Sequence, residues 1–191
     1  KELKTEPFGF TFDIGYSYQR KSTDKLYELW GILRIIRILT EQELAFTPCE
    51  GWLYDGSFDK INPVFVPVLN SGTSILLKKD DITIRISYDK EVPTPYNVKD
   101  TLDEPLHTVN NNNKPDCRID VYYQSIYVGS LVIDFKYRRP EKIFCPNEDK
   151  ALKQLHAYSV GLSSDVLYSN NVNPIIKNRI QPVSDVFAFT P

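Results

Sequence analysis

Methionine is absent from this 191-residue sequence, and cysteine and histidine are scarce. The three cysteines, Cys49, Cys117 and Cys145, are widely spaced, so no pair has the C-x-x-C spacing of a zinc site. We therefore expect free thiols in a reducing compartment and a cytoplasmic location. The two histidines, His107 and His156, also lack a neighbour at metal-ligand spacing, which favours structural roles for both.

Long apolar runs and an excess of one charge are lacking as well. The most apolar stretch, residues 26–39, is interrupted by Glu28, Arg34 and Arg37, and it is shorter than the roughly 20 apolar residues that a membrane-spanning helix needs. We therefore expect no membrane partner. The formal net charge is -2, so any charge that binds DNA must be local or come from another domain.

The remaining composition is that of a folded domain, with 41% hydrophobic residues. We expect residues 1–20 to be an N-terminal strand segment of a larger protein, since apolar side chains recur at every second position from Phe8 to Tyr18. Residues 21–191 are expected to form one domain with a β-rich insertion at about 50–100. The clearest strands of that insertion are residues 74–79 and 82–88, which a turn at residues 79–81 joins into a hairpin.

Two helices and a second hairpin are predicted around this insertion. Residues 26–42 form a helix that is apolar nearly all round, which is typical of a helix buried inside a domain. Residues 116–137 alternate as two strands with a turn near residues 127–129, and a second helix runs from Asn147 to about Val160. With a last strand at residues 185–189, the pattern predicts an α/β fold.

Two acids and a lysine are expected to meet at one end of the second hairpin. Asp134 and Lys136 point to the same face because side chains alternate along a strand. Asp116 lies at the mouth of the partner strand, close to Lys136 across the ladder. Two carboxylates can hold Mg²⁺, or Mn²⁺ in its place, for hydrolysis of a phosphodiester, and the backbone carbonyl of Phe135 is a further candidate ligand. Lys136 would orient the attacking water or help to deprotonate it.

Four further residues are candidates for the same site. Glu28 lies in the apolar helix, where burying a carboxylate costs several kcal/mol unless it is paired or bound to metal, so Glu28 is a candidate metal ligand or base. Gln154 and Tyr158 are four residues apart and share a helix face. Arg138 adds positive charge beside the acids, which suits contact with DNA.

Other interpretations stay open at this point. The hairpin acids could form ordinary cross-strand ion pairs, which are worth roughly 0.2–1 kcal/mol. Glu28 could pair with Lys25, one turn away. Asp120 has the same strand parity as Asp116, so it competes for the role of first acid, or it could pair with Arg118 or Lys136.

The order of these motifs resembles the PD-(D/E)XK nuclease superfamily and, within it, the McrC-like nuclease subunit of McrBC-type restriction systems. The resemblance covers residues 27–158 and consists of the YELW helix, Pro115-Asp116, Asp134-Phe135-Lys136 and the Q-x-x-x-Y element of Gln154 and Tyr158. It implies a restriction-endonuclease-like α/β/α sandwich with a mixed central β-sheet. It also implies that Glu28 completes the metal site, and that Gln154 and Tyr158 face the DNA or position Lys136.

The function implied by the resemblance is Mg²⁺-dependent endonuclease cleavage of DNA in a restriction or phage-defence system, alongside an AAA+ NTPase motor subunit. Cutting both DNA strands usually requires two active sites, which favours a homodimer. Two alternatives remain. One is a junction resolvase, exonuclease or RNase that uses the same residues, and the other is a catalytically inactive nuclease fold that binds DNA or acts as a scaffold.

Overall fold

The computed structural model describes residues 23–51, 70–94, 99–110, 113–139, 141, 149–168 and 179–190. The strand expected at residues 8–18, much of the insertion and the predicted start of the second helix at Asn147 lie outside these residues. Within the described ranges, no helix is long and apolar enough to cross a membrane.

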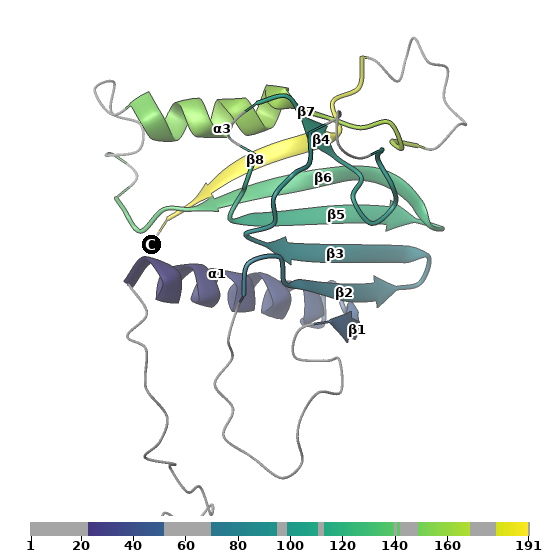
Figure 1. Ribbon diagram of the computed structural model, residues 1–191. Helices are drawn as coiled ribbons and strands as arrows, with labels where there is room; N and C mark the ends of the chain where they lie inside the picture. The colour runs from purple at the N-terminus through teal and green to yellow at the C-terminus, as the bar shows by residue number, and fades with distance from the viewer. Residues whose placement is uncertain are drawn as a thin grey trace, which may run out of the picture.

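A mixed six-stranded sheet forms the centre of the domain (Figure 1). Its strands, in order across the sheet, are β1 (Thr47–Gly51), β2 (Ser74–Lys79), β3 (Ile82–Tyr88), β5 (Cys117–Tyr123), β6 (Ile126–Phe135) and β8 (Val183–Phe189). All neighbours pair antiparallel except β6 and β8, which are parallel. A separate short ladder pairs β4 (His107–Thr108) with β7 (Leu162–Ser163).

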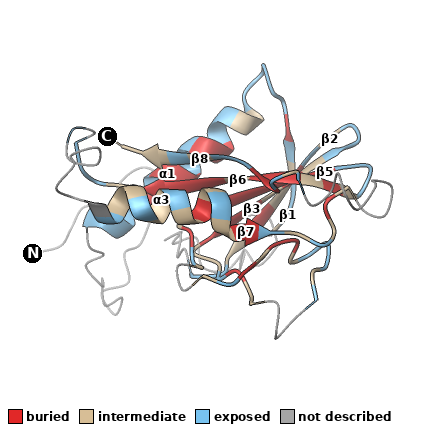
Figure 2. Cartoon of the chain, turned by 90° about the horizontal axis from the view of Figure 1, so that it is seen from above, coloured by how far each residue is buried: buried red, intermediate tan, exposed pale blue. Residues whose placement is uncertain are grey.

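The helices α1 (Thr23–Thr40) and α3 (Asp149–Gly161) lie on opposite faces of this sheet (Figure 2). One buried core lies between α1 and the sheet, and a second core contains Tyr158 of α3, Leu162 of β7 and residues from the other face of the sheet. The chain passes from β6 through α3 to β8, which is the helical crossover that parallel strands need. The predicted α/β class with a mixed sheet is therefore confirmed.

The apolar alternation seen in the sequence explains the core on the α1 side. Ile84, Ile86 and Tyr88 of β3 are buried on one face, where Ile75 and Leu77 of β2 lie beside them. Burial of each such aliphatic side chain contributes roughly 1.5–3 kcal/mol relative to exposure. The hairpin predicted at residues 74–88 is confirmed.

The turn of the second hairpin lies earlier than predicted. Gln124 and Ser125 form it, with φ angles of 47° and 65°, the left-handed conformation that two-residue hairpin turns favour. Gly129 lies instead within β6, opposite Val121 and beside a bulge in the ladder. The prediction of a turn near residues 127–129 was wrong because a glycine inside a strand gives the same signal as a turn.

The prediction that α1 is buried all round was also wrong. Leu26 and Leu33 are exposed because only one side of the helix packs on the sheet, and Trp30 stays half exposed although its ring packs on that of Phe189. Gly31 lies at the closest approach of α1 to the sheet, where a Cβ atom would overlap the ring of Phe135.

Candidate active site

Asp116 and Asp134 lie level with each other at one end of the sheet. Cys117, the first residue of β5, pairs with Ile133 of β6. Asp116, one residue before β5, therefore lies level with Asp134. Asp116 Oδ2 accepts a hydrogen bond of 2.8 Å from the backbone N–H of Phe135. The corrected turn therefore places Asp116 opposite Asp134, not opposite Lys136 as we expected from the sequence.

Asp134 is fully buried, and neither of its carboxylate oxygens has a hydrogen-bond partner within the described residues. The pKa of Asp116 is raised from 3.8 to about 8. Burial is the largest cause, followed by the proximity and negative charge of Asp134, and the charge of Glu28 adds to the effect. The two acids thus form a buried site with an excess of negative charge, where a proton or a cation is favoured.

Lys136 lies beside both Asp134 and α3. Its Nζ is 2.7 Å from Asp134 Oδ2, the distance of an ion pair. The same Nζ donates a hydrogen bond of 3.2 Å to Gln154 Oε1. With its side chain 20% exposed, Lys136 connects the buried acids to solvent.

A chain of hydrogen bonds continues from Gln154 to the residues before Asp116. Gln154 Nε2 donates to the Tyr158 hydroxyl at 3.1 Å, and that hydroxyl donates to the backbone carbonyl of Lys114 at 2.9 Å. Because the Tyr158 hydroxyl proton is used on Lys114, its oxygen accepts from the Gln154 amide, which leaves the amide oxygen facing Lys136. Tyr158 is 1% exposed, so a direct contact of this side chain with DNA is excluded in this structure and its role is internal.

Glu28 is buried on α1 and has two partners. Lys25 Nζ lies 2.7 Å from Glu28 Oε2, and the hydroxyl of Tyr88 donates to the same oxygen. Burial, followed by the Glu28 carboxylate, raises the pKa of Tyr88 to about 12, so this hydroxyl keeps its proton. The pairing with Lys25 that we considered from the sequence is confirmed, while the role of Glu28 as a metal ligand stays a prediction.

Two other predicted residues flank the site. The backbone N–H of Arg138 donates to the carbonyl of Lys136 at 2.7 Å, and the Arg138 side chain is exposed beside it. Phe135 packs its ring on the α1 side, as expected for a residue between Asp134 and Lys136. Its carbonyl remains a predicted ligand.

Asp120, the competing candidate for the first acid, belongs to a separate buried network. It lies opposite Ser130 in the ladder, not opposite Asp134, and its carboxylate is 3.0 Å from Arg118 Nε. The Ser130 hydroxyl donates to Asp120 Oδ1 at 2.5 Å. Because these donors satisfy the carboxylate, we assign Asp120 a structural role, and its predicted pairing with Arg118 is confirmed.

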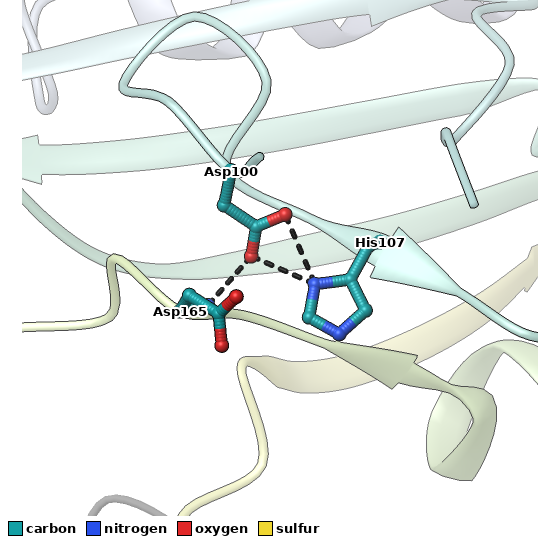
Figure 3. Close-up of side chains that lie close together, drawn as sticks. All are labelled: Asp100, His107 and Asp165. Atoms are coloured by element: carbon teal, nitrogen blue, oxygen red, sulfur yellow. Dashed lines mark hydrogen bonds and ion pairs between the residues drawn. The ribbon is translucent and has the colours of Figure 1, made fainter. Parts of the chain in front are cut away.

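A cluster that we did not predict joins Asp100, His107 and Asp165 (Figure 3). His107 Nδ1 lies 2.8 Å from Asp100 Oδ2, and the backbone N–H of Asp165 donates to the same oxygen at 2.6 Å. One potential ligand atom of each side chain lies within 4.8 Å of the others, a spacing that could hold a metal ion. The buried Asp100 carboxylate is already satisfied by these two partners, so the geometry favours a structural link between β4 and the turn after β7. No short spacing in the sequence signals this cluster.

No protein-family model, curated protein or solved structure matches this chain. Its function is therefore inferred from the side chains that the fold brings together at the Asp116 and Asp134 site.

Proposed function

We propose that the chain is a PD-(D/E)XK nuclease domain that hydrolyses phosphodiester bonds of DNA with the help of Mg²⁺. The observation that carries this proposal is the placement of two carboxylates, the partly buried Asp116 and the fully buried Asp134, beside the single ammonium group of Lys136. A buried carboxylate costs several kcal/mol unless it is paired or bound to metal. Lys136 lies 2.7 Å from Asp134 Oδ2 and pairs with that acid, so a divalent cation would offset the charge of the second acid when both are ionised.

The donor set suits this cation. Carboxylate oxygens are the ligands that Mg²⁺ prefers, and Asp116 and Asp134 would hold it. Glu28, which does not cluster with these two acids within the described residues, and the Phe135 carbonyl are auxiliary candidates. When bound, Mg²⁺ lowers the pKa of a coordinated water and stabilises charge on the phosphate. Lys136 lies where it can orient the attacking water or bind a phosphate oxygen.

Gln154 supports Lys136 in this role. Its amide oxygen accepts from Lys136 Nζ and so holds the ammonium group at the mouth of the acidic site. Arg138, exposed two residues later, supplies local positive charge toward the DNA backbone. The net charge of -2 is consistent with a further DNA-binding module outside this domain.

The fold supports the same class of enzyme at a coarser level. A mixed sheet between helices is compatible with the restriction-endonuclease-like sandwich, and the catalytic residues lie at the ends of adjacent central strands. By the resemblance of its motifs, we assign the domain to McrC-like nucleases of restriction or defence systems, with an AAA+ NTPase motor as partner and a homodimer for double-strand cutting.

Cleavage assays test this proposal. We expect the full chain to cut plasmid or linear DNA in Mg²⁺ but not in EDTA, and Lys136→Ala to reduce the rate by about 10²–10⁴-fold, the usual contribution of a general acid or base. Lys150→Ala, an exposed lysine at the start of α3, is the matched control and should cut normally. Full activity of Lys136→Ala would overturn the assignment. Preference for branched DNA, DNA ends or RNA would favour a resolvase, exonuclease or RNase, and DNA binding without any cleavage would favour an inactive module.

A further inference from the structure

An exposed aromatic surface borders the β8 edge of the sheet. The side chains of Trp30, Tyr137 and Phe187 are 51%, 52% and 46% exposed, and we call these three residues the β8 patch. The ring of Trp30 lies 5.8 Å from that of Phe189, and the ring of Tyr137 lies 5.4 Å from that of Tyr27, so the patch continues into the core. A group of exposed aromatic side chains is typical of an interaction surface.

The backbone of β8 is open along the same edge. β8 pairs with β6 on one side, and no described residue pairs with its other side. The carbonyl of Phe189 accepts a hydrogen bond of 2.9 Å from the Lys136 N–H, so Phe189 faces β6. Since successive residues face opposite edges, Val186 and Ala188 face the open side. The Val186 N–H is bonded there to Asp185 Oδ1, so of these two residues it is Ala188 whose N–H is left for an added strand. Such an edge is a template for an added strand.

We propose that residues 8–18 of this chain bind along β8 as a seventh strand and cover the β8 patch. Every second residue of this segment is aromatic or aliphatic, while the residues between them are small or polar. The apolar set is Phe8, Phe10, Phe12, Ile14, Tyr16 and Tyr18. A strand with this pattern has one apolar face, which matches a sheet edge whose aromatic side chains lie on one face.

The position of α1 allows this segment to reach β8. The helix begins at Thr23, and the start of α1 lies beside the C-terminal end of β8 (Figure 1). The ring of Tyr27, in the first turns of the helix, lies 6.1 Å from the ring of Phe189. The five steps from Tyr18 to Thr23 span at most about 17 Å. Because the segment has to end near the end of β8, it runs parallel to β8.

The resulting topology agrees with the rest of the sheet. A strand parallel to β8 is also parallel to β1, so the segment, α1 and β1 form a crossover unit. This unit crosses the sheet in the opposite direction to the β6–α3–β8 unit, and its helix lies on the opposite face. A crossover that runs in the opposite direction with its helix on the opposite face has the same handedness. The two crossover units therefore share one hand, as expected because nearly all such connections are right-handed.

Hydrogen exchange in the full chain tests this proposal. One variant replaces the apolar face (Phe12→Ser, Ile14→Ser, Tyr16→Ser), and the matched control replaces the polar face (Thr11→Ala, Asp13→Ala, Ser17→Ala). We expect the amides of residues 8–18 and of Ala188 to exchange at least 10-fold faster in the apolar-face variant than in the unmodified chain or the control. Protection of Ile119 and Ile133 in the central strands shows that the domain stays folded, and Tyr16→Ser alone serves if the triple variant unfolds.

Fluorescence gives a second measurement on the patch itself. Trp52→Phe leaves Trp30 as the single tryptophan, since the chain has two. Its emission should shift to longer wavelength in the apolar-face variant and stay unchanged in the control. Residues 8–18 that exchange as fast as an unstructured peptide in the unmodified chain would refute the proposal. If dilution of the protein removes the protection of the Ala188 amide and also halves the molecular mass in solution, a second copy of the chain covers the edge instead of residues 8–18.

Discussion

Asp116 is attached to the strand that carries its partner acid, because its Oδ2 accepts a 2.8 Å hydrogen bond from the backbone N–H of Phe135. This bond joins Asp116 to the peptide unit between Asp134 and Phe135, directly before Lys136. The three groups are thus positioned by the register of β5 and β6, elements rigid enough to hold a preorganised site. The fold keeps two carboxylates together at an electrostatic cost that a bound cation would relieve.

The stability of the metal-free protein is expected to fall as the pH rises from about 5 to 8. The pKa of Asp116 is near 3.8 in the unfolded chain and about 8 in the fold, so the folded state binds more protons in this window. Stability then decreases with pH, and the loss is complete above the folded pKa. Urea unfolding in EDTA across this range measures the slope. Asp116→Asn should be less sensitive to pH, and an identical slope in that variant would show that Asp116 is not the titrating group.

Asp134→Asn should abolish cleavage and yet stabilise the metal-free domain by roughly 1–3 kcal/mol. The substitution removes the buried charge of one of two neighbouring carboxylates, and the amide can donate to Asp116. Urea unfolding in EDTA gives the free energy of unfolding, and a plasmid assay in Mg²⁺ gives the activity. A clear loss of stability would instead mean that the pair of Asp134 with Lys136 is a structural ion pair.

Tyr158→Phe should slow cleavage by about 10-fold without changing the affinity for Mg²⁺. The variant removes the acceptor that orients the Gln154 amide and the donor to the Lys114 carbonyl, at a cost of about 1 kcal/mol for each hydrogen bond. Kinetics and calorimetry separate the two effects. Tyr123→Phe, at an exposed tyrosine, is the matched control. Weaker Mg²⁺ binding with unchanged turnover would argue against a role in positioning Lys136.

Gly31→Ala should lower stability by roughly 1–3 kcal/mol, the usual cost of overpacking a core. The new Cβ atom overlaps the ring of Phe135, so that the helix or β6 must shift. Because the N–H of Phe135 holds Asp116, we expect activity to fall as well. Thermal unfolding and a cleavage assay measure both effects, with Arg34→Ala on the exposed side of α1 as the control. Unchanged activity would show that the site tolerates movement of Phe135.

The sequence predicted those parts of the fold that depend on periodicity. Alternation identified β3, where Ile84 and Ile86 are buried, and strand parity placed Asp134 and Lys136 on one face. The register was not predictable, because Gln124 and Ser125 form the turn while the more typical turn residue, Gly129, lies inside a strand.

Contacts between distant segments were not predictable either. The bond from Tyr158 to Lys114 depends on how α3 packs on the sheet, and the link between Asp100 and His107 depends on the path of an irregular loop. Composition also could not show that Trp30 is half exposed, since an apolar helix can bury either face.

Calorimetric titration of Mn²⁺ into the full chain tests most directly whether Asp116 and Asp134 form a cation site. The titration compares the unmodified chain with Asp116→Asn and with His107→Ala, which removes the other candidate cluster among the described residues. We predict equal binding by the unmodified chain and His107→Ala, and at least 10-fold weaker binding by Asp116→Asn. Undiminished binding by Asp116→Asn, with loss in His107→Ala, would place the cation at the Asp100 cluster and contradict the proposed active site.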